Sequence, residues 1–399
     1  MAPRLLTEVF LDFGLQPVTN RFRRADSREA APGYPMRLVV DVDTGLLRLD
    51  RPFPVEEVRP RYEWLTCFEP EGHLDALVDR ILKLPDVEER SVFGGYSFKD
   101  DSTLERIGAE GYRRQWRLQP ERDFGVTDPC ASIETFQAVF DVARAKEMRA
   151  RLGRADVMIV RHVIEHAYRL TEFVSAICTL VQPDGYIVWE LPDCERGLDA
   201  GDCTILWEEH THYFTGFTFK QLLIELGFSI IHYESVSYPL ENSVVAITKR
   251  RGAVSAECLG ETAAVSEEVA RAHRFGVKIT ERRKVIQSKL RAVKESGGTI
   301  AIFGAAHLSV TFLSVMNVAD IVDFAVDDNA NKIGMKMPVG NLDILGSDSL
   351  YTKNVTLCLL GLNPQHHREV VERHSGFTDK GGRFASVFPG TELDLEEMI

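Results

Sequence analysis

Apolar and polar residues alternate in blocks over residues 86–250. Short apolar runs of strand length occur at residues 91–96, 155–160, 186–191, 228–236 and 244–248. Stretches with helical periodicity lie between or beside them, at residues 102–111, 137–152, 170–180 and 218–226. Alternation of strands and helices is typical of a doubly wound α/β sheet. No helix separates the last two strands, so we expect them to form an antiparallel edge.

The segments on either side of this unit have different patterns. Residues 1–85 indicate a small, irregular N-terminal domain that ends in an amphipathic helix at residues 73–84. Residues 251–296 are rich in charges and poor in helix breakers, which predicts a connector of one or two helices. Residues 297–399 alternate strands and helices again, on a smaller scale. We therefore predict an α/β protein with a central Rossmann-like domain at residues 86–250 and a smaller Rossmann-like domain at the C-terminus.

Composition and charge exclude several classes of protein. The 399 residues carry 47 basic and 60 acidic side chains, a formal net charge of −13, and this balance argues against a nucleic-acid polymer as partner. No apolar run approaches the roughly 20 residues that span a bilayer, and the N-terminus lacks the pattern of a signal peptide. The seven cysteines are scattered without a CxxC pair, so a reducing cytoplasm fits best.

The densest cluster of reactive side chains is WEEHTHYF at residues 207–214. It follows the strand at residues 186–191, and open α/β sheets bind ligands beyond the carboxyl ends of their strands. An imidazole can take up a proton while a carboxylate orients it, so Glu209 and His210 are candidates for proton abstraction. The alternative is a surface loop whose polar groups are satisfied locally.

A second cluster, RHVIEH at residues 161–166, follows the strand at residues 155–160. His162 and His166 have the spacing of one helical face, which also suits zinc, but a metal site would need a further ligand. We favour a contact to a cofactor or substrate over a metal. The alternative is a helix start whose histidines bond backbone carbonyls.

Two glycine turns and an aromatic stretch give weaker evidence of ligand-binding sites. Gly94 and Gly95 lie where the first strand of the central unit meets its first helix, and Gly304 has the same position in the C-terminal unit. Glycine there lets the backbone approach a ligand, although neither turn has the GxGxxG pattern. Tyr62 and Trp64 could line a pocket, or they could simply pack together.

Several motifs, taken in order, resemble the sugar C-methyltransferases. In the first two thirds of the chain these are LDFGLQPVTNRF (11–22), ADVMIVRHVIEH (155–166), VQPDGYIVWELP (181–192) and EHTHYF (209–214). Near the C-terminus they are FGAA (303–306), VDDNANKIG (326–334) and Pro338. The family consists of class I enzymes that use S-adenosylmethionine (SAM) to methylate a carbon of nucleotide-linked 4-keto deoxysugars. The resemblance covers nearly the whole chain.

The resemblance implies a role for individual residues. His210 would remove the proton next to the ketone, with Glu209 as its partner and His166 beside the sugar or the developing enolate oxygen. Contacts to SAM are expected from Gly94, Gly95, Ser97, Asp100, Gln119 and His162. Contacts to the nucleotide sugar are expected from Tyr62, Trp64, Trp207, Tyr213, Gly304, His307 and Asn363.

The chain also departs from the family pattern. The family's N-terminal region usually binds zinc through four cysteines, whereas only Cys67 lies in the first hundred residues here, so we expect no zinc. Residues 93–101 replace the family's first SAM motif and bring in Lys99, while Gln119 replaces an acidic residue. Two alternatives therefore stay open: a SAM-independent epimerase or isomerase of a nucleotide keto sugar, and a non-catalytic nucleotide-sugar-binding subunit.

Overall fold

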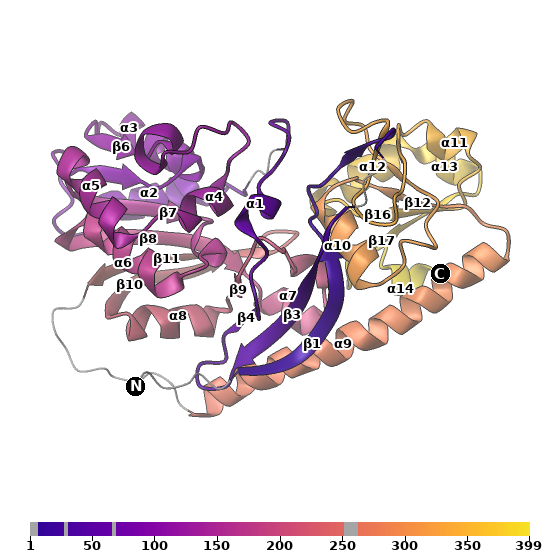
Figure 1. Ribbon diagram of the computed structural model, residues 1–399, viewed down its shortest axis with the longest axis horizontal. Coiled ribbons are helices and arrows are strands. Elements are labelled where there is room, and N and C mark those ends of the chain that lie inside the picture. The colour runs from indigo at the N-terminus through magenta and orange to yellow at the C-terminus, as the bar shows by residue number, and fades with distance from the viewer. Residues whose placement is uncertain (1–6, 28–30, 66–68, 251–261) are drawn as a thin grey trace.

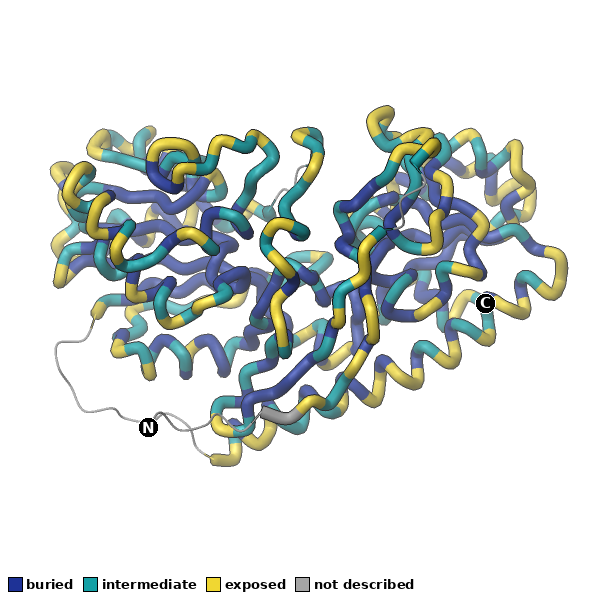
Figure 2. The backbone as a smooth tube through the Cα atoms, viewed as in Figure 1, coloured by how far each residue is buried: buried dark blue, intermediate teal, exposed yellow. Residues whose placement is uncertain are grey.

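The computed structural model describes residues 7–27, 31–65, 69–250 and 262–399. Two α/β units stand side by side, a β-hairpin lies between them, and a long helix runs below the hairpin and the C-terminal unit (Figure 1). The dark blue interior of Figure 2 follows the two sheets, while the outer side of the long helix is exposed.

The central unit contains a six-stranded sheet with the order β10-β11-β8-β7-β5-β6. Its strands are β5 (Phe93–Gly95), β6 (Gln115–Arg117), β7 (Ala155–Arg161), β8 (Val181–Asp193), β10 (Phe228–Val236) and β11 (Asn242–Arg250). β6, β5, β7 and β8 are parallel, whereas β11 runs antiparallel to both β8 and β10. This confirms the predicted doubly wound sheet and its antiparallel edge.

Helices cover both faces of this sheet. Alternate residues of β7 explain why: Val157 and Ile159 pack into one buried cluster, and Met158 and Val160 into another. The first cluster is covered by α2 (Leu74–Leu82) and α3 (Asp101–Ala109). The second is covered by α4 (Ile133–Ala138), α5 (Val142–Leu152), α6 (Leu170–Leu180) and α8 (Gly216–Glu225).

One predicted helix of the central unit starts too early. The periodicity suggested a helix over residues 137–152, whereas α5 begins at Val142 and residues 137 and 138 belong to α4. Asp141 is extended and its side chain accepts the Arg144 N–H at 2.8 Å, so it caps a new helix. The local hydrogen bond outweighs the continuous apolar pattern.

The N-terminal region is more regular than its sequence suggested. β1 (Thr7–Pro17) and β3 (Gly33–Asp41) form a long antiparallel hairpin, extended by β4 (Leu47–Leu49) and β9 (His212–Tyr213). Two register shifts in the β1–β3 pair interrupt the alternation of side chains, which hid β1 in the sequence. A short helix, α1 (Val55–Val58), follows. Cys67, the residue on which the zinc expectation depends, lies outside the described residues.

The C-terminal unit is a five-stranded parallel sheet with the order β15-β13-β12-β16-β17. Its strands are β12 (Ile300–Phe303), β13 (Phe324–Val326), β15 (Ile344–Leu345), β16 (Leu357–Leu360) and β17 (Arg383–Ser386). Its helices are α10 (His307–Val315), α11 (Ser349–Thr352), α12 (His367–Arg373), α13 (Ser375–Asp379) and α14 (Leu395–Met398). The strand order reverses between β12 and β16, the place where such sheets bind ligands.

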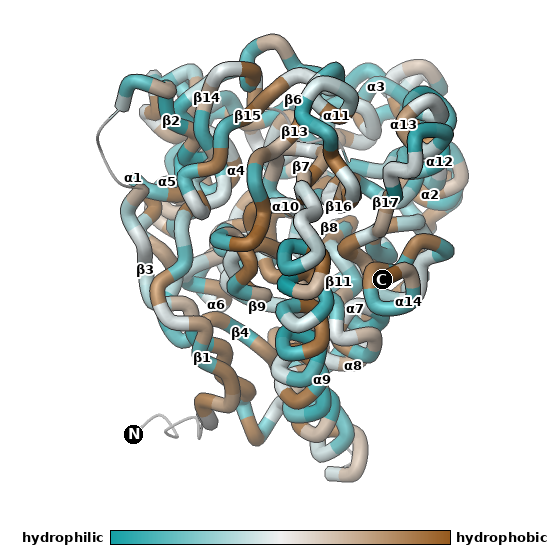
Figure 3. The backbone as a smooth tube through the Cα atoms, turned by 90° about the vertical axis from the view of Figure 1, so that its right-hand side faces the viewer, coloured by the Kyte–Doolittle hydropathy of each residue, from teal (hydrophilic) through white to brown (hydrophobic). Residues whose placement is uncertain are grey.

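The long helix α9 (Thr262–Glu295) joins the two units. At a rise of about 1.5 Å per residue it extends roughly 50 Å. Hydrophobic and hydrophilic residues alternate along it (Figure 3), and Phe275, Ile279, Ile286 and Leu290 are buried. They share one core with the N-terminal hairpin and the C-terminal sheet, and α9 also contacts α7 (Glu195–Ala200). Two further short strands, β2 (Arg23–Arg24) and β14 (Met335–Lys336), pair across the same junction.

Among the helices of the described residues, none combines the length and the hydropathy that a bilayer crossing requires.

Candidate functional site

Two segments meet at the carboxyl edge of the central sheet. β7 leads into the turn η3 (Ile164–His166), and the loop that contains residues 207–211 approaches it. The backbone N–H and the hydroxyl of Thr211 donate to the Glu165 carbonyl at 2.8 and 3.0 Å. These bonds hold together the two histidine clusters that the sequence singled out separately.

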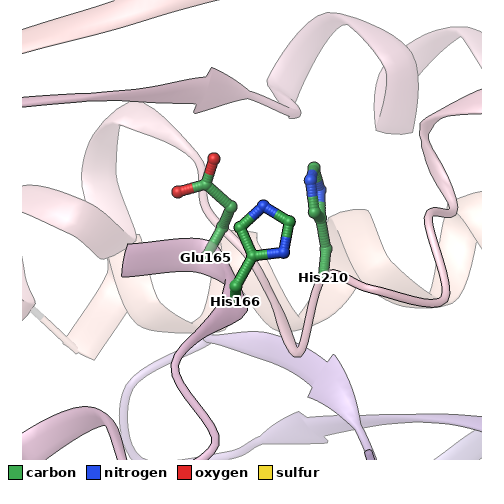
Figure 4. Close-up of side chains that lie close together, drawn as sticks. All are labelled: Glu165, His166 and His210. Atoms are coloured by element: carbon green, nitrogen blue, oxygen red, sulfur yellow. The ribbon is translucent and has the colours of Figure 1, made fainter. Parts of the chain in front are cut away.

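His166 and His210 form the centre of this site (Figure 4). Their ring centroids lie 4.6 Å apart, with the ring planes at 90°. Nδ1 of His166 lies 3.1 Å from the carbonyl oxygen of Glu209, and because a carbonyl only accepts, Nδ1 carries the proton and Nε2 keeps its lone pair. Burial lowers the pKa of His166 to about 3 and lowers the pKa of His210 as well. Both rings are therefore neutral, and His210 is able to accept a proton.

The N-terminal motif positions the glutamates that precede His210. Glu208 accepts hydrogen bonds from the backbone N–H and the hydroxyl of Thr19 at 2.6 and 2.9 Å. Glu209 accepts one from the side-chain amide of Asn20 at 3.2 Å. The segment at residues 11–22 thus contributes directly to the site, from the far end of the chain.

Glu134 is a buried carboxyl of this site that the sequence did not reveal. It lies on α4, and one of its carboxyl oxygens lies within 4.8 Å of an oxygen of Glu209 and of a ring nitrogen of His166. Burial raises the pKa of both groups, and their mutual proximity raises that of Glu209 further. Within the described residues, the Glu209 carboxyl makes no hydrogen bond to His210, the partner that the sequence suggested. Glu134 sits in an ordinary helical pattern, so no sequence signal marked it.

The glycine turn after β5 is determined by close packing. A Cβ on Gly94 would lie 2.6 Å from the Trp116 ring, and a Cβ on Gly95 would lie 2.9 Å from Leu104. Both glycines are therefore required by neighbours on β6 and α3. The need for glycine here is explained without invoking a ligand.

Asp100 organises the backbone of this turn. Its carboxylate accepts the N–H groups of Tyr96, Ser97 and Arg161 at 2.7, 2.8 and 3.0 Å. The Ser97 hydroxyl caps the 3₁₀ turn η1 (Phe98–Asp100), which opens α3. Burial raises the pKa of Asp100 to about 7. These bonds tie the end of β5 to the end of β7.

A buried ionic network lies beside the turn. Arg161 pairs with Glu190, and their side chains are 1% and 0% exposed. His162 Nε2 lies 3.1 Å from Glu190, its Nδ1 lies 3.7 Å from Glu69, and Glu69 also pairs with Lys99. Burial alone would lower the pKa of His162, but the neighbouring carboxylates of Glu69 and Glu190 raise it above its usual value. His162 also has a left-handed backbone with φ of +50°, a strained conformation that is common at functional sites.

Gln119, at the end of β6, opens onto a cavity of about 560 Å³. Its backbone N–H donates to Asp123 at 2.6 Å, and this fixes the start of the following turn. The other residues that line the cavity are Pro120, Glu121, Arg122, Val126, Thr127, Asp128, Pro129 and Ala131. Of the six residues predicted to contact SAM, Gln119 is the one that lines this cavity.

The C-terminal unit reaches the site through His307. Its ring stacks on Trp207 with a centroid distance of 3.6 Å, and its Nδ1 lies 3.0 Å from the Thr19 hydroxyl. Gly304 and Asn363 follow β12 and β16, at the reversal of strand order. Three parts of the chain therefore meet at His307.

The aromatic residues predicted for the substrate divide into two groups. Tyr62 and Trp64 stack at 4.9 Å and line a cavity of about 450 Å³. The remaining residues of that cavity are Arg24, Ala25, Asp26, Asn331, Ile333, Gly334 and Met335. Tyr213 is instead fully buried, and its hydroxyl donates to the Trp207 carbonyl at 2.9 Å. This bond stabilises the loop that contains residues 207–211.

Comparison with known proteins gives two family matches that lie end to end. Residues 103–233 match the model of a methyltransferase domain, and residues 235–389 match that of the C-methyltransferase C-terminal domain. The C-methyltransferase NovU of Streptomyces niveus is 24% identical over 280 residues, which cover 68% of this chain and 66% of that protein, just under two thirds of its length.

Solved structures also align with part of the chain. One is a 1,6-didemethyltoxoflavin-N1-methyltransferase of Burkholderia thailandensis with bound S-adenosylhomocysteine. It is 11% identical, the alignment covers 45% of this chain and 78% of that chain, and the TM-score is 0.30. The CurJ carbon methyltransferase is 14% identical, covers 45% of this chain and 54% of its own, and has a TM-score of 0.27.

Proposed function

Because the chain combines a methyltransferase domain with a C-methyltransferase C-terminal domain, we propose that it methylates a carbon atom of a nucleotide-linked 4-keto deoxysugar. The methyl donor would be SAM. The observation that supports the proposal best is the contact between His166 and His210 at the carboxyl edge of the central sheet.

The chain's own side chains can perform the proton transfer that such a reaction needs. A ketone acidifies the hydrogen on the adjacent carbon, and His210 is the base that removes it, which leaves an enolate. The neutral His210 ring packs perpendicular to that of His166, and the Trp207 ring stacks on it with a centroid distance of 5.6 Å. The position of the ring is thus fixed before the substrate binds, which favours the transfer.

The residues around Gln119 fit SAM. The cavity beside it has the size of a small-molecule site, about 300–1,000 Å³, and lies at the carboxyl end of β6, where open α/β sheets take ligands. The Gln119 side chain would accept a hydrogen bond from a ribose hydroxyl. When bound, SAM supplies a sulfonium methyl group that a carbanion can attack. His210 meanwhile holds the proton that left the sugar.

The C-terminal unit is suited to the nucleotide. Gly304 and Asn363 follow two neighbouring strands at the reversal of strand order, and α10 begins there at His307. Backbone N–H groups at a helix start attract phosphates. Tyr62 and Trp64 would contact the sugar or the base from the second cavity.

The proposal is tested by titrating the purified chain with SAM in a calorimeter. The chain is then incubated with SAM and a nucleotide-linked 4-keto deoxysugar, and the mass of the product is measured by mass spectrometry. We expect saturable SAM binding and a sugar that is heavier by one methyl group. The absence of SAM binding at millimolar concentration would refute it.

One observation favours a second candidate, an epimerase or isomerase that needs no SAM. The N–H groups of Tyr96 and Ser97, at the turn where a cofactor would bind, are already taken up by Asp100. Enolate formation by His210 requires no methyl donor. Deuterium incorporation next to the ketone, without SAM and without methylation, would favour this alternative.

A further inference from the structure

The surroundings of His166 are unusually rich in buried carboxyl groups. Glu134 and Glu165 are 5% and 2% exposed, and Glu209 is partly buried. Both carboxyl oxygens of Glu165 and Oε2 of Glu134 lack a hydrogen-bond donor. Buried carboxylates without partners are costly, so such a cluster calls for a cation or for protons.

The neighbouring cations are engaged elsewhere. Lys99 pairs with Glu69, and Arg161 pairs with Glu190. Nδ1 of His162 lies 3.8 Å from Glu165 and 3.7 Å from Glu69, so Glu165 shares this ring with a second carboxyl. An oxygen of the Glu134 carboxyl and one of the Glu209 carboxyl lie within 4.8 Å of each other, and two carboxylates this close favour a cation or a proton between them.

The geometry matches that of a metal site. One ligand atom from each of Glu134, His166 and Glu209 lies within 4.8 Å of the other two. Tetrahedral ligands at about 2.2 Å from an ion lie about 3.6 Å apart, so the side chains would have to close by up to about 1 Å, which a change of rotamer can supply. A second set, Glu165, His166 and His210, meets the same distance limit and includes the residues of Figure 4.

The protonation of His166 also suits a ligand. Its Nδ1–H donates to the Glu209 carbonyl, as metal-binding histidines usually do with a backbone carbonyl. Nε2 is left with a lone pair that no donor in the described residues fills. A neutral imidazole of this kind cannot donate a hydrogen bond from Nε2 to an enolate oxygen, but it can bind a metal ion.

We propose that Glu134, His166 and Glu209 bind a divalent metal ion. We choose this set over the one with His210 because it satisfies the two carboxyls that now face each other, and it leaves His210 available as the base. Both carboxyls bind a metal ion in their ionised form, so any proton that Glu134 or Glu209 holds leaves as the ion enters. Two carboxylates and one imidazole are ligands suited to Mn²⁺ or Zn²⁺.

The ion has a chemical role that rests on the proposed function. Placed beside His210, it would polarise the ketone oxygen of the sugar and stabilise the enolate that forms when the proton leaves. Glu165 would remain as a nearby carboxylate that keeps the site attractive to cations.

The test uses Mn²⁺ and the full-length chain, dialysed against a chelator and then against buffer. Calorimetry and the paramagnetic resonance signal of free Mn²⁺ both report the affinity without any substrate. We expect one ion per chain. We also expect at least a tenfold weaker affinity for Glu134→Gln and for the conservative Glu134→Asp, since loss or misplacement of a ligand acts on this scale.

Matched controls make the assignment specific. His210→Asn and the exposed Glu147→Gln should bind Mn²⁺ within about threefold of the wild type, and circular dichroism checks that every variant is folded. No saturable Mn²⁺ binding at millimolar concentration would overturn the proposal. So would loss of binding in His210→Asn with retention in Glu134→Gln, because it would assign the other set.

The outcome is independent of the methyltransferase proposal. If Mn²⁺ binds through Glu134 but SAM does not bind, the proposed function fails and the metal site stands. If SAM binds and the sugar is methylated without any metal dependence or Mn²⁺ binding, the metal site fails and the function stands.

Discussion

Replacing Arg161 with methionine tests how much the buried ionic network contributes to folding. The Arg161 guanidinium pairs with Glu190 and also donates to the carbonyl of Lys99 and the hydroxyl of Ser102. Methionine fills much of the same space but leaves the fully buried Glu190 carboxylate without its main counter-charge. Removing one partner of a buried pair costs about 3–5 kcal/mol.

Glu190 keeps some of its hydrogen bonds in this variant. The Ser243 hydroxyl and the His162 ring lie 3.0 and 3.1 Å from its carboxylate. We therefore expect the lower end of the range, a loss of about 3 kcal/mol in the free energy of unfolding. For a unit of this size, that loss lowers the melting temperature by about 6–12 °C.

The assay is urea unfolding of the full chain, followed by far-UV circular dichroism and tryptophan fluorescence. Arg368→Met is the matched control, because Arg368 forms an exposed pair with Glu372 on α12. That variant should have the urea midpoint of the wild type, since exposed pairs contribute little. A loss of less than about 1 kcal/mol for Arg161→Met would refute the reasoning, because the pair would then behave like a surface pair.

Three further substitutions test other parts of the account. Thr19→Val removes the hydroxyl contacts to Glu208 and to His307. We expect about 5–10-fold weaker binding of a nucleoside diphosphate in a calorimetric titration. An unchanged affinity would mean that Thr19 does not help to position the substrate site. Gly94→Ala brings a methyl group against Trp116, so we expect a loss of about 1–3 kcal/mol in a thermal melt, and a stable variant would contradict the packing argument. Asp141→Ala removes the cap of α5 and should cost about 1 kcal/mol in urea, whereas no loss would mean that the break before α5 has another cause.

The sequence predicted the parts of the fold in which a local pattern and the tertiary packing agree. α6 and β10 have the predicted bounds, and in α6 the apolar residues that set the period also face the core. β1 escaped prediction because its bulges break the alternation. The start of α5 was placed five residues too early because the period continues across Asp141, whose side chain caps the helix there.

The sequence predicted the site residues that belong to motifs, but it did not predict which residues the fold brings into contact. His166 and His210 were both singled out, yet their contact depends on Thr211 bonding across two loops. Glu134 lay in an unremarkable helix, and only the folded chain brings it to Glu209. The roles proposed for Gly94 and Gly95 in cofactor binding stay a prediction, since packing alone accounts for both glycines.

The most direct test of the central claim is one reaction analysed by mass spectrometry in deuterated water. The chain, SAM and a nucleotide-linked 4-keto deoxysugar are incubated together, with His210→Asn in parallel. We predict a product that is heavier by one methyl group for the wild type and unchanged substrate for the variant. Deuterium incorporation without methylation, or equal methylation by His210→Asn, would contradict the account.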